Sequence, residues 1–244
     1  MKTIMIGGIL VAAFVLSACS TQPTSNGNGQ GQGSSQQKGE QDSDYVVDKS
    51  DILEKGHLIE GIAVSSVDEK ERVGLILMRE EEKLARDVYK TLGEKWDQRI
   101  FENIAQSEQS HTDAVKELLD RYEIEDPVKD DAVGSFTSAE MKRLYDELVE
   151  QGSGSLVSAL EVGAIVEDLD IKDLQELLEQ TDNEDIKIVY ENLLRGSRNH
   201  MRAFVRNMER NGEKYSPQYI NQETYQGIIE AQQERGGGRG KSRK

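Results

Sequence analysis

Apolar residues recur three and four positions apart through most of the chain between residues 67 and 211. This spacing places them on one side of an α-helix, and no segment alternates apolar and polar residues convincingly enough to predict a strand. The pattern predicts four long amphipathic helices and one shorter helix, so the expected fold class is all-α. The long helices are expected at 67–92, 98–122, 155–169 with a continuation to Leu178, and 183–211, and the short one at 138–150.

Glycines and capping residues mark the ends of these helices. Gly93 is expected to end the first helix, Ser138 to cap the short one, and Asp182 or Asn183 to open the last. A jog is expected at Asp170 in the third long helix. The second and third long helices are joined by a much longer connection, as in a four-helix bundle with one crossover.

The two ends of the chain differ from this body, which is expected to span 67–211. Residues 1–18 contain one Lys and an apolar run, the pattern of a secretory signal peptide. The last three residues of the signal and Cys19, Leu16-Ser17-Ala18-Cys19, resemble the lipobox of bacterial lipoproteins, which implies that Cys19 is lipidated. Residues 19–66 are predicted to be this Cys and a flexible linker with an N-terminal arm. Residues 212–244 are predicted to be a tail with a basic, Gly-rich end.

The predicted anchor sets the expected location. A lipid on Cys19 would hold the protein at the membrane of the cell envelope, facing the extracytoplasmic side. Composition narrows the partners further, because a net charge of -16 repels a phosphate backbone and argues against nucleic acid. A single Cys allows neither an internal disulfide nor a thiolate zinc site. Any metal must therefore be held by carboxylates and by the three His residues.

Polar residues interrupt the apolar stripes of three predicted helices. Glu108 and His111 lie one turn apart on one face of the second helix, and Glu167 and His200 fall on the apolar stripes of the third and fourth. A buried carboxylate needs a partner, because its burial costs several kcal/mol. Convergence of Glu and His from several helices predicts a dinuclear carboxylate site. The ligand types suit iron or manganese, and zinc stays open. His57 lies outside this set, in the N-terminal arm.

Four stretches of the chain together resemble a known group. They resemble the ferritin-like superfamily of rubrerythrin and bacterioferritin, and in particular the uncharacterised family DUF2202. The stretches are Met78–Tyr89, Glu108-Gln-Ser-His111, Gly163–Leu174 and Leu194–His200. The resemblance implies a ferritin-like bundle with a dinuclear iron or manganese centre. It also implies oxidation of Fe(II), or reduction of peroxide or dioxygen, with an external electron donor.

The resemblance also implies roles for individual residues. Glu108 would bridge the two ions, His111 and His200 would supply one imidazole to each, and Glu167 would be the remaining carboxylate. On the first helix it selects Glu82 as a terminal ligand, because the spacing to a small residue and an aromatic residue fits the superfamily. Tyr89 is that aromatic residue and a weak catalytic candidate.

Two points stay open at this level. Helical periodicity alone would choose Glu81 rather than Glu82 as the inward carboxylate. The superfamily also usually has a Glu three residues before the last His, where this chain has Ser197. Either Glu167 with Asp170 takes the bridging role, or the site holds metal less tightly or binds only one ion.

A second hypothesis is a non-enzymatic helical bundle that is displayed at the cell surface to bind a partner protein. Its polar core residues would pair with one another rather than with a metal. Association into a homodimer stays open under both hypotheses. The metal content of the purified protein discriminates between them.

Overall fold

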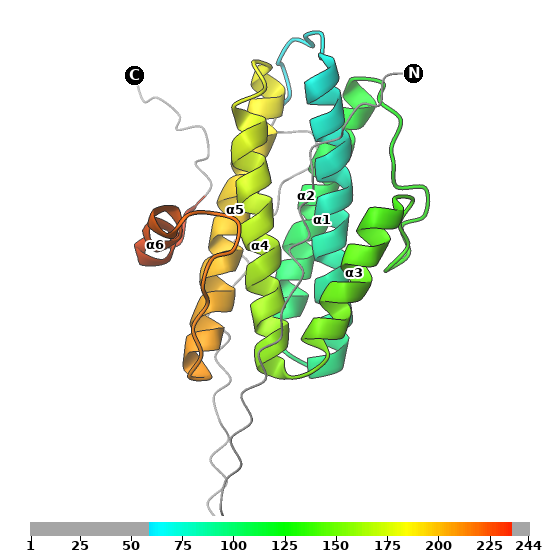
Figure 1. The fold of residues 1–244 in the computed structure, drawn as a ribbon. Helices are drawn as coiled ribbons and strands as arrows, with labels where there is room; N and C mark the ends of the chain where they lie inside the picture. Colours follow the sequence, from blue (N-terminus) through cyan, green and yellow to red (C-terminus); the bar gives the residue numbers. More distant parts are fainter. Residues whose placement is uncertain (1–58, 236–244) are drawn as a thin grey trace, which may run out of the picture. The chain divides into compact units, whose positions relative to one another are not determined.

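The computed structural model describes residues 59–235, which all belong to one compact unit. Every regular element in this range is a helix, which confirms the all-α prediction (Figure 1). The helices are α1 (Glu69–Trp96), α2 (Arg99–Arg121), α3 (Ala139–Gly152), α4 (Leu156–Leu178), α5 (Glu184–Arg210) and α6 (Gln222–Glu230).

The four long helices form two hairpins that lie side by side (Figure 1). α1 packs along α2 and α4 packs along α5, and the hairpins meet where α1 contacts α4 and α2 contacts α5. The connections inside the hairpins are short, whereas the connection from α2 to α4 spans residues 122–155 and contains α3. Because of this crossover, α2 and α4 run in the same direction (Figure 1). The long connection agrees with the predicted one.

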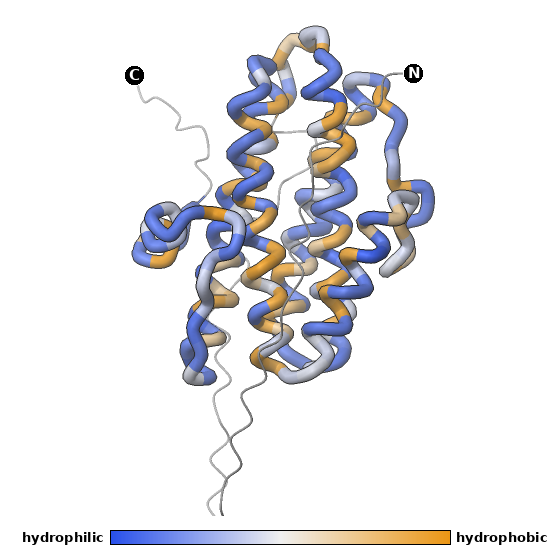
Figure 2. The backbone as a smooth tube through the Cα atoms, viewed as in Figure 1, coloured by the Kyte–Doolittle hydropathy of each residue, from blue (hydrophilic) through white to orange (hydrophobic). Residues whose placement is uncertain are grey.

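The buried side of α1 is broader than one stripe, since α1 packs against α2, α3 and α4. Figure 2 shows hydrophobic positions recurring along each long helix. The line of buried residues that faces the centre passes through Leu75, Met78, Glu82, Ala85, Tyr89 and Leu92, at helical spacings of three and four. Val73, which the apolar pattern places inward, is instead 37% exposed. Val73 therefore lies at the edge of the wide buried surface of α1 rather than within it.

The predicted helix boundaries hold at several places and fail at Gly93. Ser138 caps α3 by accepting a hydrogen bond from Met141 N (3.3 Å), and Asn183 is the N-cap of α5. Gly93 lies inside α1, which ends at Trp96 with Asp97 in the left-handed conformation. A Cβ at Gly93 would approach Phe101 Cβ at 3.1 Å. This Gly therefore allows α1 and α2 to approach each other closely rather than ending a helix.

The third long helix, α4, is continuous through Asp170, so the expected jog is absent. Its N-cap is Ser155, whose hydroxyl accepts from Ser158 N at 3.0 Å. Continuity matters for the site, because one unbroken helix carries both Glu167 and Asp170, one turn apart on one face.

The crossover is fastened to α1 by a buried group of charges. Lys83, Arg86 and Asp87 are each at most 1% exposed. Asp87 accepts from Lys83 Nζ (2.5 Å) and pairs with Arg86 (2.8 Å). Lys83 also donates to Ala132 O at 3.0 Å, and Gly134 N donates to Asp87 at 3.0 Å. These contacts hold the loop between α2 and α3 against α1.

The segment after residue 211, predicted to be a tail, packs on the body and contains α6. Four of its apolar or aromatic residues are at most 8% exposed, namely Tyr215, Ile220, Tyr225 and Ile228. The expectation that the body ends at residue 211 is therefore wrong, because these side chains are part of the core. The described chain belongs to the body up to residue 235. The basic Gly-rich end at 236–244 lies outside the described residues.

The predicted N-terminal features also lie outside the described residues. They are the signal peptide at 1–18, Cys19, His57 and the linker and arm as far as residue 58; within the remainder of the predicted arm, Ile59 is 3% exposed and belongs to the core. Within the part of the chain that the structure describes, none of the helices is both long enough and apolar enough to cross a membrane.

Candidate metal centre

The residues predicted to hold a metal come from four helices and meet in the core. Glu82 lies on α1, Glu108 and His111 on α2, Glu167 on α4 and His200 on α5, and each is at most 2% exposed. The packing of both hairpins brings them together, since each hairpin contributes carboxylates and one imidazole. The rings of His111 and His200 face each other with centroids 5.6 Å apart.

Glu108 stands between the two imidazoles. Its Oε2 lies 2.7 Å from His111 Nδ1, and its Oε1 lies 2.7 Å from His200 Nδ1. The Glu-x-x-His spacing on α2 accounts for the first contact, because residues three apart share a helix face. The second contact requires α5 to pack against α2. One carboxylate thus uses its two oxygens toward two different imidazole nitrogens.

The other two carboxylates lie one on each side of Glu108. Glu82 Oε2 lies 3.2 Å from His111 Nδ1, and Glu167 Oε1 lies 3.5 Å from His200 Nδ1. The donor atoms therefore form two overlapping groups, Glu82 with Glu108 and His111, and Glu108 with Glu167 and His200. Within each group the donor atoms lie within 4.8 Å of one another. Glu108 belongs to both groups.

The pKa values of these buried groups shift in different directions, depending on whether burial or a neighbouring charge has the larger effect. Burial and the nearby Glu108 raise the pKa of Glu82 to about 8, although His111 works against this. Burial would also raise the pKa of Glu108, but the two imidazoles outweigh it and hold that pKa well below its ordinary value. Burial lowers the pKa of His200, yet Glu108 and Glu167 prevail and raise it to about 10. The buried acids together hold more potential negative charge than the imidazoles balance.

Neighbouring hydroxyl groups orient two of these side chains. Tyr89 OH donates to Glu167 Oε1 at 2.6 Å, so the predicted aromatic residue does contact the cluster. His200 Nε2 lies 3.0 Å from Ser107 Oγ. In the neutral imidazole that metal binding requires, a proton on Nε2 donated to Ser107 would leave Nδ1 as the ligand atom. Sequence reasoning missed Ser107, because a Ser on a helix face gives no signal of its own.

Glu81, the alternative to Glu82, is buried but faces a different group. It is 6% exposed, and burial together with Asp173 and Asp170 raises its pKa well above the ordinary value. Its near neighbours are thus acids on α4 rather than the imidazoles. The structure therefore brings Glu82, and not Glu81, to the His residues.

Ser197, where the resemblance leads one to expect a Glu, contacts an acid from another helix. Its hydroxyl donates to Asp170 of α4 and to Leu193 O (3.0 Å). Burial and the charges of Glu82 and Glu167 raise the pKa of Asp170 well above its usual range. A carboxylate from α4 therefore lies beside the cluster, next to the position on α5 where one is missing.

Two glycines give the site its room, and sequence reasoning did not single them out as site residues. A Cβ at Gly196 would lie 2.6 Å from His111 Nε2, and one at Gly163 would lie 2.4 Å from Phe204 Cε1. Gly196 therefore permits the imidazole of α2 to lie directly against α5. Helical Gly costs about 1 kcal/mol relative to Ala, so its presence at such a contact is a signal of close approach.

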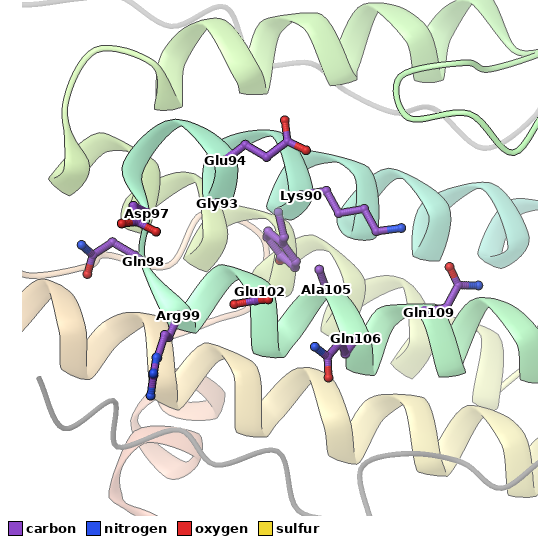
Figure 3. Close-up of a pocket in the computed structure, with 11 residues that line it drawn as sticks. Lys90, Gly93, Glu94, Asp97, Gln98, Arg99, Glu102, Ala105, Gln106 and Gln109 are labelled. Carbon is purple, nitrogen blue, oxygen red and sulfur yellow. The ribbon is translucent and has the colours of Figure 1, made fainter.

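A groove of about 520 Å³ is lined by residues of α1 and α2 (Figure 3). Most of the residues that line it are of polar type, including Lys90 and Glu94 of α1 and Gln106 and Gln109 of α2. Tyr89 also lines it, while its hydroxyl contacts Glu167. The Tyr89 side chain is therefore shared by the groove and the cluster.

Comparison with known proteins places the chain in a family. Residues 71–232 match the family model described as "Uncharacterized protein domain (DUF2202)". The chain is 57% identical over 178 residues to the uncharacterized protein MJ0754 of Methanocaldococcus jannaschii. This match covers 73% of this chain and 96% of that protein. The crystal structure titled hypothetical protein MJ0754, from Methanococcus jannaschii, has a TM-score of 0.70 at 57% identity and covers 71% of this chain and 99% of that one. This chain therefore belongs to the DUF2202 family of uncharacterised protein domains.

Proposed function

We propose that this protein binds a dinuclear iron or manganese centre within a ferritin-like four-helix bundle. The observation that carries the proposal is the position of Glu108, whose two oxygens lie 2.7 Å from the Nδ1 atoms of two different His residues. A carboxylate so placed is suited to bridge two cations, each with its own imidazole. In this proposal Glu82 and His111 complete one side, and Glu167 and His200 complete the other.

The residues present fit such a centre in three respects. The donors are carboxylates and imidazoles without thiolate, the set that suits iron or manganese. Glu82 Oε1 is buried and has no hydrogen-bond partner among the described residues. Such an atom is costly unless a ligand or cation satisfies it. Gly196 leaves space for His111 where any other residue would press on the ring.

The centre would supply redox chemistry, namely oxidation of Fe(II) by dioxygen or peroxide at an open coordination position. The chain's own residues would prepare the site for it. Tyr89 fixes the orientation of Glu167, Ser107 fixes that of His200, and the hydrophobic walls exclude water. In Fe(II) oxidation the electrons come from Fe(II) itself, whereas reduction of peroxide or dioxygen without net Fe(II) oxidation would need the external electron donor that the resemblance implies.

We also propose that the protein is a lipoprotein of the cell envelope, held to the membrane through Cys19. The lipobox-like sequence and the Gly/Ser/Gln-rich linker that follows support this proposal. Replacement of Cys19 by Ala should release the protein from washed membranes into the soluble fraction. Equal retention of the variant and the wild type would contradict lipid anchoring.

The metal proposal is tested by elemental analysis of the full chain after incubation with Fe(II) or Mn(II) without oxygen. We expect about two ions per chain in the wild type and a large loss in the His111→Ala/His200→Ala double variant. The matched control is His57→Ala, which removes the third His and should leave metal content unchanged. Glu108→Gln is a second variant of similar shape, and circular dichroism would establish that each variant remains helical.

Equal metal content in the wild type and the double variant would overturn the metal proposal. It would favour the second hypothesis, in which His111 and His200 serve only as buried partners of Glu108. The 2.7 Å contacts are also compatible with protonated imidazoles, so this measurement decides between metal binding and purely structural ion pairs.

A further inference from the structure

The C-terminal segment, residues 213–235, is fastened to α4 at Asp168, the residue directly after Glu167. Asp168 is completely buried. Its carboxylate accepts hydrogen bonds from Tyr215 OH (2.7 Å), from Gln218 N (2.5 Å), from Tyr219 N (3.1 Å) and from Ile220 N (2.9 Å). Three backbone amides of the segment thus depend on one side chain of α4.

The same segment is fastened to α5 at residues around His200. Glu234 pairs with Arg198 at 2.5 Å and with Arg202 at 3.0 Å. Asn199, the residue directly before His200, donates to Glu234 O (2.9 Å) and accepts from Glu234 N (2.9 Å). The segment therefore contacts Asp168 on α4 and Asn199 on α5. Each of these residues is the sequence neighbour of a candidate ligand, Glu167 or His200.

Helical geometry places these contacts on the sides of α4 and α5 that face away from the cluster. Consecutive residues of an α-helix point about 100° apart, so Asp168 and Asn199 face away from the direction of Glu167 and His200. The segment holds the outer side of each helix at the level where the inner side presents a candidate ligand. The rotation of α4 and α5 about their axes is thereby fixed at these two points.

We propose that segment 213–235 positions Glu167 and His200 for metal binding, an inference that rests on the proposed metal centre. The family match extends through residue 232, so most of this segment belongs to the DUF2202 domain itself. Asp168, Asn199 and Glu234 act as positioning residues: Asp168 and Asn199 hold the segment on α4 and α5, Glu234 is its own charged contact with α5, and none of the three belongs to the groups of clustered donor atoms. Ligand orientation by such supporting contacts is a general feature of metal sites.

Coupling of this kind acts in both directions. If the docked segment favours metal binding, bound metal must favour the docked segment by the same factor. Cleavage within residues 213–235 by a protease should therefore be slower in the metal-loaded protein than in the metal-free protein.

The decisive experiment compares Asp168→Asn with the wild type in the full chain, using Co²⁺ as the probe. An Asn side chain has one carbonyl oxygen and cannot replace both carboxylate oxygens that the segment uses. We expect Co²⁺ affinity to fall on the order of tenfold, with a changed visible absorption spectrum of the bound ion. The spectrum reports the arrangement of ligands, which a general loss of stability would not alter.

Asp185→Asn is the matched control. Asp185 is also buried and also accepts from a tyrosine hydroxyl (Tyr122, 2.6 Å) and a backbone amide (Ile186, 2.9 Å). It lies fifteen residues before His200 on α5, roughly 22 Å away at the helical rise. This variant should lose stability while keeping the Co²⁺ affinity and spectrum of the wild type.

Glu234→Gln provides a second variant in case Asp168→Asn does not fold. It removes the charge that pairs with Arg198 and Arg202 at a partly exposed position and should weaken Co²⁺ binding severalfold. Unchanged affinity and spectrum in both folded variants would overturn the positioning role alone. Failure of the wild type to bind Co²⁺, Fe²⁺ or Mn²⁺ would overturn the metal centre and this inference with it.

Discussion

The two sides of α1 both bury charged residues, but they balance the charge in different ways. On the side that faces the crossover, Asp87 pairs with Lys83 and Arg86, and each of these cations also reaches a backbone carbonyl. On the side that faces the other long helices, Glu82 meets Glu108 and a single imidazole within hydrogen-bonding reach. Because Arg86 also pairs with Asp131 (2.9 Å), two cations meet two anions on the first side, whereas the other side has an excess of acids.

This difference separates a structural role from a binding role. A buried charge needs a partner, and the crossover side supplies one from the chain itself. On the other side, burial together with the neighbouring acids raises the pKa values of Glu82, Glu167 and Asp170. In the proposed metal centre, cations that the chain does not supply would neutralise these acids. The following predictions test this comparison.

The largest effect on stability is expected from Asp87→Asn. The substitution removes the buried anionic partner that Lys83 and Arg86 share, so the free energy of unfolding should fall by about 3–5 kcal/mol. Chemical denaturation measures this change. Asp120→Asn is the matched control, because Asp120 also pairs with a Lys four residues away, but at an exposed position worth under about 1 kcal/mol. Equal losses in the two variants would remove the distinction between buried and exposed pairs.

Glu82→Gln should change the stability of the metal-free protein little but weaken metal binding strongly. With a pKa of about 8, Glu82 is largely protonated at neutral pH in the metal-free protein, so a neutral isostere should change its stability by less than about 1 kcal/mol. Loss of a ligand should nevertheless weaken metal binding by roughly 10- to 100-fold in a titration. Glu81→Gln is the control and should leave the affinity nearly unchanged, because Glu81 faces Asp170 and Asp173. A larger effect at Glu81 would reverse the assignment of the α1 ligand.

Metal affinity should rise with pH. In the metal-free protein the pKa of His200 is raised to about 10 and that of Glu82 to about 8, so both hold protons near pH 7 that metal must displace. Each displaced proton contributes about a tenfold gain in affinity per pH unit below the relevant pKa. Calorimetric titration in buffers of different ionisation enthalpy counts the protons released. Affinity that is independent of pH between about 6 and 8 would contradict the assigned ligands.

The smallest effect is expected from Tyr89→Phe. It removes the hydroxyl that donates to Glu167, which should lower the stability of the metal-free protein by about 1 kcal/mol. Tyr190→Phe is its matched control, because Tyr190 OH is buried without a hydrogen-bond partner among the described residues and its loss should be neutral or stabilising. Thermal denaturation of the two variants side by side measures the difference.

Local sequence patterns were sufficient for the helices and for much of the candidate site. Periodicity gave the all-α class and the positions of the five main helices, since packing of amphipathic faces determines both. The Glu-x-x-His spacing placed Glu108 and His111 together, because residues three apart on a helix must share a face. Polar residues on apolar stripes then pointed to Glu167 and His200, which the structure places beside them.

What required the tertiary structure was every contact whose partner lies on another element. The choice between Glu81 and Glu82 depended on which flank of α1 faces α2, and three packed neighbours made the buried surface too broad for periodicity to decide. Gly93 resembles a helix end in sequence, but the approach of Phe101 explains it. The segment after residue 211 carries too few apolar residues to show a stripe, yet Asp168 and Asn199 hold it in place. Periodicity reports which face of a helix is buried, whereas the identity of the group that buries it is decided only when distant parts of the chain pack together.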